Sequence, residues 1–178
     1  MALIKKVKGV APQFGKNCFL ADNATITGDV IFGDDCSVWF NAVVRGDVNT
    51  IRIGRNVNIQ DGAIVHCTYQ KAPVSIGNNV SIAHNAIIHG CTIHDNVLIG
   101  MGAIVMDGAV INSNSIVGAG ALITEGTVVE SGTVWAGLPA KKVKDIDQAL
   151  LEGQVLRISK NYNMYASWYD QDSEEVKP

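Results

Sequence analysis

The feature that most constrains this chain is an aliphatic or aromatic residue that recurs every six positions from Phe14 to Trp135. A period of six matches neither the two-residue alternation of a strand nor the 3.6-residue period of a helix. It fits the flat side of a triangular coil in which each side points one apolar residue inward and three sides close one turn. Successive turns would then stack at the ordinary strand spacing of roughly 4.8 Å. Small insertions interrupt the period after Val44 and Val65, and one residue is missing after Ile88; the twenty inward positions are Phe14, Leu20, Ile26, Phe32, Val38, Val44, Ile53, Ile59, Val65, Ile76, Ile82, Ile88, Ile93, Ile99, Val105, Ile111, Val117, Ile123, Val129 and Trp135.

The residues between these positions support the same fold. The fourth residue after each inward position is almost always small or β-branched, and Gly, Asn and Asp supply the corners. Cys18 and Cys36 occupy that small position, so we interpret them as core residues stacked one turn apart. The pattern resembles the hexapeptide-repeat family over roughly residues 10–140. The resemblance implies an all-β, left-handed parallel β-helix.

The repeat ends at Gly137-Leu138-Pro139-Ala140, and a different period follows. Apolar residues between Asp145 and Tyr169 are spaced as in an amphipathic α-helix, with Gly153 as an internal weak point. We therefore predict two parts. Residues 1–140 form the β-helix with the functional site, and residues 141–178 form a C-terminal α-helix and an acidic tail.

Charge and composition exclude several kinds of protein. A net charge of −3 without a basic block gives no footprint for nucleic acid. No apolar run approaches the roughly 18 residues of a membrane span, and no signal peptide is evident. Four cysteines without a CxxC pair do not indicate a disulfide framework. We expect a cytoplasmic protein with neither nucleic-acid nor membrane partners.

Three of the four histidines lie between Val65 and Gly90. Each residue should stack on the one three units earlier, which places Arg45, His66 and His89 in one column on an outer face. Imidazoles roughly 4.8 Å apart at the backbone can share a metal ion. The alternative is that they are surface or interface histidines without metal.

His84 belongs to a different unit and should stack over Asp61 near a corner. From there it does not easily reach the space between His66 and His89 of its own chain. If His84 is a third ligand, it must come from a neighbouring subunit, which predicts metal sites between subunits. Three such sites close with three-fold symmetry, as a homotrimer.

Several short motifs sharpen this prediction. Arg45-Gly46-Asp47, Asn58-Ile59-Gln60-Asp61-Gly62, His66 and His84-x-x-x-x-His89 resemble the motifs of γ-class carbonic anhydrases. The resemblance implies that His66 and His89 of one subunit and His84 of the next bind Zn²⁺, or Fe²⁺ or Co²⁺. It implies reversible hydration of carbon dioxide to bicarbonate. A zinc-bound water with a pKa near 7 would supply the hydroxide.

The resemblance also implies roles for further residues. Gln60 corresponds to a residue that hydrogen-bonds the metal-bound water or bicarbonate, and Asn58 to another polar neighbour. Arg45 and Asp47 correspond to a salt-bridged pair at the subunit interface, and Tyr162 to an active-site tyrosine. Purely structural roles stay open for Arg45 and Asp47, a surface role for Gln60, and core packing for Tyr162. We interpret His94 as a surface residue and do not expect Cys67 to ligate.

Two positions depart from that family. Prototype members carry glutamates where this chain has Val48 and the segment 67–73, which contains no acid. Because rapid hydration needs a titratable proton shuttle, we expect weak activity. Two alternatives remain: an acyltransferase or thioesterase acting on coenzyme A thioesters, and a non-catalytic metal-binding trimer.

Overall fold

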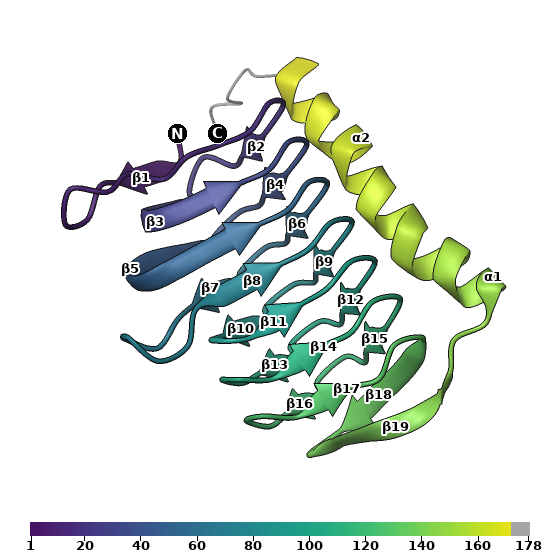
Figure 1. Cartoon of the computed structure of the whole chain (residues 1–178). Helices are drawn as coiled ribbons and strands as arrows, with labels where there is room; N and C mark the ends of the chain where they lie inside the picture. The colour runs from purple at the N-terminus through teal and green to yellow at the C-terminus, as the bar shows by residue number, and fades with distance from the viewer. Residues whose placement is uncertain (172–178) are drawn as a thin grey trace.

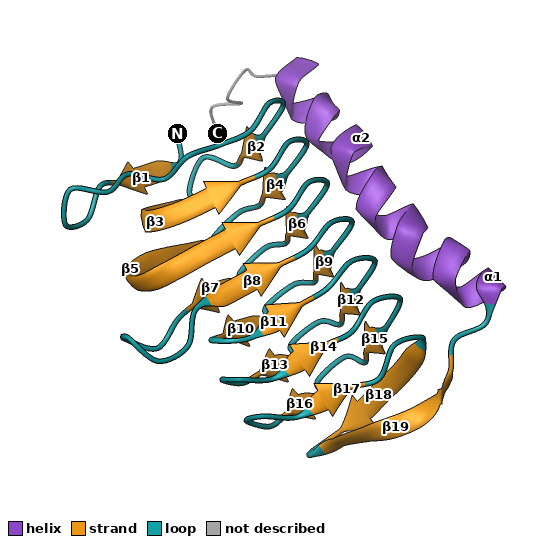
Figure 2. Cartoon of the chain, viewed as in Figure 1, coloured by secondary structure: helices purple, strands orange, loops and turns teal. Residues whose placement is uncertain are grey.

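The computed structural model describes the backbone of residues 1–171 and the side chains of residues 1–169. The chain winds into a triangular prism of stacked parallel strands with one helical segment along its side (Figures 1 and 2). The left-handed parallel β-helix predicted from the six-residue period is confirmed. Residues 172–178 lie outside the described part, and with them most of the predicted acidic tail.

Three flat faces make up the prism, and two sheets cover them. The long strands β3 and β5 turn a corner, so one sheet covers two faces. Face one consists of the first halves of β3 (Thr25–Phe32) and β5 (Val43–Ile53), followed by β7 (Ile64–His66), β10 (Ile87–His89), β13 (Ile104–Val105) and β16 (Leu122–Ile123). Face two consists of their second halves, followed by β8 (Val74–Ile76), β11 (Thr92–Ile93), β14 (Val110–Ile111) and β17 (Val128–Val129).

Face three is the second sheet. It consists of β2 (Phe19–Leu20), β4 (Ser37–Val38), β6 (Asn58–Ile59), β9 (Ser81–Ile82), β12 (Leu98–Ile99), β15 (Ile116–Val117) and β18 (Thr133–Gly137), with β19 (Ala140–Asp145) at its edge. At the other end of the prism, β1 (Leu3–Lys5) pairs with β3. The three faces enclose one continuous apolar core.

The core consists of the residues that the period predicted. Seventeen of the twenty inward positions are buried, and Phe14, Leu20 and Trp135, near the two ends, are partly buried against them. Ile88 pairs with Val65, and Val65 with Val44, so inward residues of successive turns lie directly above one another. Burying each such side chain contributes about 1.5–3 kcal/mol, which makes the stacked column the main source of stability.

One corner of the prism is stabilised by a ladder of asparagines. Asn56, Asn79, Asn96 and Asn114 all have φ between 55° and 59°, a left-handed conformation that Asn tolerates better than most residues. Each side-chain amide donates a hydrogen bond to the next Asn along the prism, at N···O distances of 2.8, 3.0 and 2.9 Å. The same residues thus fix the backbone conformation of the corner and join successive turns of the β-helix by hydrogen bonds.

The region after Pro139 differs from the prediction in one respect. Residues 140–145 form β19, which runs antiparallel to β18, so the sheet continues past the boundary placed at residue 140. The six-residue period gave no sign of this strand, because Lys141, Lys142 and Lys144 are exposed and β19 forms by pairing with the edge of the last turn.

The predicted helix is present from residue 148. It consists of α1 (Gln148–Leu150), a π-helical segment η1 (Leu151–Leu156) that contains Gly153, and α2 (Arg157–Gln171). Helix α2 runs along the stacked turns beside face three (Figure 1), where Tyr162 contacts Trp39 with ring centroids 5.2 Å apart. No helix in the described part of the chain is long and apolar enough to cross a membrane.

Candidate metal centre

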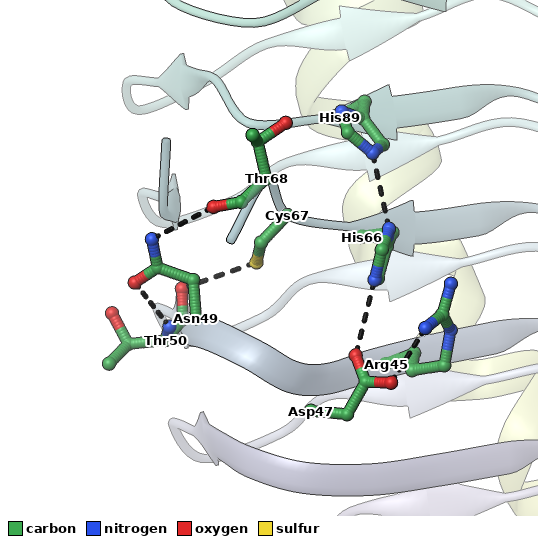
Figure 3. Close-up of polar contacts among 8 residues, drawn as sticks. All are labelled: Arg45, Asp47, Asn49, Thr50, His66, Cys67, Thr68 and His89. Atoms are coloured by element: carbon green, nitrogen blue, oxygen red, sulfur yellow. Dashed lines mark hydrogen bonds and ion pairs between the residues drawn. The ribbon is translucent and has the colours of Figure 1, made fainter. Parts of the chain in front are cut away.

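All three irregularities of the period fall at the corner that follows face one. The insertion in β5 shifts the pairing with β3 after Gly46, and the insertion after β7 forms the loop 67–73. Bulges of this kind redirect side chains and are frequent beside functional sites. Here the bulge of β5 brings Asp47 within reach of His66 on the next turn (Figure 3).

His66 and His89 face each other across adjacent turns, as the stacking predicted. Arg45 pairs with His66 and His66 with His89 in the parallel ladder of face one, which confirms the column of these three residues. His66 Nδ1 lies 3.1 Å from His89 Nε2 (Figure 3). Two nitrogens bound at 2.0–2.1 Å to one tetrahedral ion would lie roughly 3.3 Å apart, so this spacing suits two ligands of one metal ion.

A carboxylate holds the far nitrogen of each imidazole. Asp47 Oδ1 lies 3.2 Å from His66 Nε2, and Asp107 Oδ1 lies 2.6 Å from His89 Nδ1. A carboxylate accepts a hydrogen bond there only if the ring nitrogen carries the proton. In two neutral rings, the facing nitrogens His66 Nδ1 and His89 Nε2 would then both present lone pairs. At 3.1 Å these repel unless a proton or a cation lies between them, so the donor set fits a metal ion.

The surrounding charges favour this arrangement. Burial lowers the pKa of His66, and the Arg45 guanidinium lowers it further against the opposing effect of Asp47. Burial alone would raise the pKa of Asp47, but hydrogen bonds from Arg45 and His66 lower it. Arg45 Nη1 lies 2.6 Å from Asp47 Oδ2. A neutral His66 beside an ionised Asp47 is the protonation state that metal binding requires.

Asp107 is ionised for a similar reason. Burial would raise its pKa, but hydrogen bonds from Thr68 and His89 lower it. Thr68 donates its hydroxyl proton to Asp107 Oδ2, and the carbonyl oxygen of Thr68 accepts from the Asn49 amide at 3.1 Å (Figure 3). The loop 67–73 is therefore joined both to the bulge of β5 and to the carboxylate that orients His89.

The other predicted site residues gather at the opposite end of face one. His84 lies in the turn before β10 and His89 at the end of that strand, so the two histidines lie at opposite ends of it. His84 Nδ1 lies 2.9 Å from Asp61 Oδ2, and its Nε2 lies 3.5 Å from the Tyr162 hydroxyl. Among the described residues, no group of three or more His, Cys, Asp or Glu side chains could hold a metal ion. The site residues thus form two separate groups within one chain.

Asn58 and Gln60 belong to the group around His84. Both are buried; the Gln60 amide donates to Asn58 Oδ1 at 2.9 Å, and the Asn58 amide donates to Ser81 Oγ at 2.8 Å. Gln60, His84 and Tyr162 line a cavity of about 420 Å³ between the helix and face three. Burial, with the Asp61 charge, raises the pKa of Tyr162 to about 12, so its hydroxyl stays protonated at neutral pH.

The hydrogen bonds that join Thr68 to Asp107 and Asp107 to His89 were not predicted from the sequence. Asp107 follows His89 by eighteen residues, one regular turn, and this spacing was the signal available. His94 is exposed, as expected for a surface residue, and burial raises the pKa of the Cys67 thiol to about 11. Val48 packs against the core, so the position where prototype members have a glutamate offers no carboxylate here.

Comparison with known proteins identifies several relatives. The family model for the bacterial transferase hexapeptide (six repeats) matches residues 90–125. A carbonic anhydrase of Geobacillus kaustophilus is 41% identical over 94% of this chain and 91% of its own length. The mitochondrial gamma carbonic anhydrase 1 of Arabidopsis thaliana is 40% identical over 88% of this chain and 58% of its own length. A crystal structure of a hexapeptide transferase family protein from Anaplasma phagocytophilum superposes with a TM-score of 0.89 at 38% identity, covering 94% of this chain and 98% of that one.

Proposed function

Because the chain belongs to the γ-class carbonic anhydrase family of hexapeptide-repeat proteins, we propose that it is a metal-dependent enzyme that reversibly hydrates carbon dioxide to bicarbonate. In this proposal His66 and His89 of one subunit and His84 of the next bind one ion within a homotrimer. Zn²⁺ is the expected metal, and Fe²⁺ or Co²⁺ would suit the same ligands.

The observation that carries the proposal is the pair of facing imidazole nitrogens 3.1 Å apart, each ring held from behind by a carboxylate. Carboxylates in this position fix the tautomer and the orientation of metal-binding histidines. Purely structural histidines on an outer face would not require two such carboxylates and two lone pairs aimed at one point.

The surface of face one supports an assembly of subunits. Beside the histidine column runs a second outward column that contains five successive apolar residues: Val43, Ile64, Ile87, Ile104 and Leu122. Ile64 is 39% exposed and Ile104 is 36% exposed in the single chain. A continuous apolar strip on a flat face is typical of an interface. Contact along this strip would bring the His84 end of one subunit toward the His66 and His89 end of another.

The groups of this chain have defined tasks in such a site. A bound Zn²⁺ would lower the pKa of a coordinated water to about 7 and so supply a nucleophile at neutral pH. Asn58 fixes the amide orientation of Gln60, which leaves Gln60 Oε1 to accept a hydrogen bond from the reacting oxygen. The Tyr162 hydroxyl lies 3.5 Å from His84 Nε2, and because burial raises its pKa to about 12 it would stay protonated as a hydrogen-bond donor beside the site. Arg45 keeps Asp47 ionised and thereby orients His66.

Proton removal is the weak step of the proposed reaction. Neither Val48 nor the segment 67–73 offers an acid, and both Asp47 and Asp107 are engaged with histidines. Proton transfer to external buffer should then limit turnover. We expect carbon dioxide hydration to be slow and to rise with the concentration of an imidazole buffer at constant pH and ionic strength. A fast rate that is independent of buffer would contradict this account.

Elemental analysis and mixed trimers test the shared site. Chains carrying His84→Ala and chains carrying His89→Ala should each bind little metal alone. If the two chains are refolded together, about a quarter of the interfaces join an intact His66–His89 pair to an intact His84. Recovery of metal in the mixture supports a site between subunits. Absence of metal from the wild-type protein would overturn the proposal, and metal without hydration would favour a non-catalytic metal-binding trimer.

The cavity of about 420 Å³ beside His84 favours one second candidate. Carbon dioxide needs far less space, whereas an acyl group could lie against Leu98, Met101 and Ile116. Hydrolysis of a coenzyme A thioester at the same metal site would use this volume. Release of free thiol from short-chain acyl thioesters, lost in His89→Ala, would favour the thioesterase over the carbonic anhydrase.

A further inference from the structure

A second, smaller cavity has walls of aromatic rings. It has a volume of about 230 Å³ and lies where the end of α2 meets the turn after β4. Six residues line it: Trp39, Asp61, Tyr162, Tyr165, Trp168 and Tyr169. Five of the six are aromatic in a chain whose aromatic content is only 6%, so this concentration of rings is local and unusual.

We call this cavity, lined by the six residues above, the aromatic box. Several of its neighbouring rings meet at steep angles. Trp39 stands at 83° to Tyr162 and at 80° to Tyr169, with ring centroids 5.2 and 5.6 Å apart. Tyr162 stands at 69° to Tyr165, 5.4 Å away, and Trp168 continues the wall 5.0 Å beyond Tyr165. Aromatic side chains from α2 and from the turn after β4 thus line one small, open hollow.

The charge of the cavity is complementary to a cation. Its lining contains the Asp61 carboxylate and, among the described residues, neither lysine nor arginine. Asp61 is partly exposed and pairs on one side with His84 Nδ1 at 2.9 Å. Aromatic rings carry negative potential on their faces and attract cations placed within about 6 Å of the ring centre.

We propose that this cavity binds a quaternary or fully methylated ammonium group. Such a group fills an apolar box, loses little hydration, and has no N–H that would need a hydrogen-bond acceptor inside it. A neutral hydrocarbon would gain from the rings but not from Asp61. A primary ammonium is more strongly hydrated than a methylated one, so it would lose more on entering a lining that is mostly aromatic.

The site is adjacent to the proposed metal centre but does not depend on it. Tyr162 lines both cavities, and Asp61 joins the box to His84. None of the three histidines proposed to bind the metal lines this cavity. Binding can therefore be measured in metal-free protein, and its outcome is separate from that of the carbonic anhydrase proposal.

The test compares choline with its uncharged isostere 3,3-dimethylbutan-1-ol. Titration calorimetry on the full-length protein should detect choline and should find the neutral isostere at least about tenfold weaker, the size expected of a cation–π contribution. The N-methyl proton resonance of bound choline should shift upfield, because it would lie over ring faces. Equal binding of both compounds, or binding of neither at millimolar concentration, would overturn the proposal.

Variants locate the site. Trp168 is 54% exposed, so Trp168→Ala should leave the fold intact and weaken choline binding by about tenfold. Trp168→Phe should retain most of the affinity. Tyr69→Ala, which removes an aromatic ring that is 58% exposed outside the box, is the matched control and should leave choline binding unchanged. Equal losses in Trp168→Ala and Tyr69→Ala would place the binding elsewhere and reject the box.

Discussion

At the scale of single residues, the hydrogen-bond partners and the burial of a side chain decide where its proton lies and how its pKa shifts. His66 and His89 differ in which ring nitrogen faces the other, because Asp47 approaches Nε2 of one ring and Asp107 approaches Nδ1 of the other. The cysteines show the same dependence. A hydrogen bond from the Cys36 thiol lowers the pKa of Cys18 to about 7, whereas burial raises the pKa of Cys67 to about 11.

Replacing Asp107 by Asn should weaken metal binding without unfolding the protein. The amide preserves the shape but presents no charge to His89, and loss of such a partner typically costs 10–100-fold in metal affinity, roughly 1.4–2.7 kcal/mol. Competition with a chromophoric chelator measures the affinity. Glu125→Gln, on a side chain that is exposed and paired with Lys71, is the control and should bind metal as the wild type does. Equal affinities for both variants would deny Asp107 this role.

The thiols should react with iodoacetamide in a defined order. Thiolates are the reactive form, so Cys18, with a pKa of about 7, should be modified at neutral pH. Cys67 and Cys91, with pKa values raised to about 11 and about 12 by burial, should stay unmodified there. Peptide mass spectrometry across pH 6–9 follows the reaction. Cys36→Ala removes the stabilising donor and should move the midpoint for Cys18 upward; an unchanged midpoint would contradict the assigned cause.

At the scale of elements, corners and insertions matter more than strands, many of which are only two residues long. The asparagine ladder of Asn56, Asn79, Asn96 and Asn114 makes three successive connections between turns regular. The corner after face one is interrupted by the bulge of β5 and by the loop 67–73, and His66 and His89 lie there. Regular corners stabilise the prism, and the irregular corner supplies the side chains of the site.

Variants of Asn79 can separate two contributions of a corner residue to stability: its left-handed backbone angle and its side-chain hydrogen bonds. It has φ of 55°, accepts a hydrogen bond from Asn56 and donates one to Asn96. Asn79→Ala should lose both bonds and strain the backbone, lowering the free energy of unfolding by about 2–4 kcal/mol. Asn79→Gly loses the bonds but accepts the angle, so it should be less destabilising. Urea denaturation measures both, and equal losses would show that the angle is not the constraint.

At the scale of the whole molecule, face one and face three have different roles. Helix α2 runs beside face three and, together with Trp39, builds the aromatic box there. Face one carries the apolar column and the histidine column on its outer surface. In the described chain, the residues proposed to bind one metal lie at the two ends of this single face.

Introducing a charge into the apolar column should dissociate the proposed homotrimer. Ile64→Glu places a carboxylate on the outer surface of face one, where it would be buried unpaired in an interface, at a cost of several kcal/mol. We expect a folded monomer by light scattering, with unchanged circular dichroism and with metal content reduced to background. Val128→Glu, on face two and 56% exposed, is the matched control and should remain oligomeric. A trimer that survives Ile64→Glu would exclude this column as the interface.

The sequence by itself determined the fold and the histidine column. A six-residue period fixes which side chains point inward and which residues of successive turns stack, so Arg45, His66 and His89 could be aligned by counting. It also placed His84 in a different unit, over Asp61. These results follow because stacking in a regular coil depends only on spacing along the chain.

Only the tertiary structure decided the features that depend on corners and on docking. The contact of Asp107 with His89, the bulge that brings Asp47 to His66, and strand β19 depend on the path of the backbone between or beyond regular turns. The aromatic box requires α2 to lie against Trp39, more than 120 residues earlier in the chain. The six-residue period does not predict such contacts, because they join the repeat to corners, to β19 or to α2, which do not follow that period.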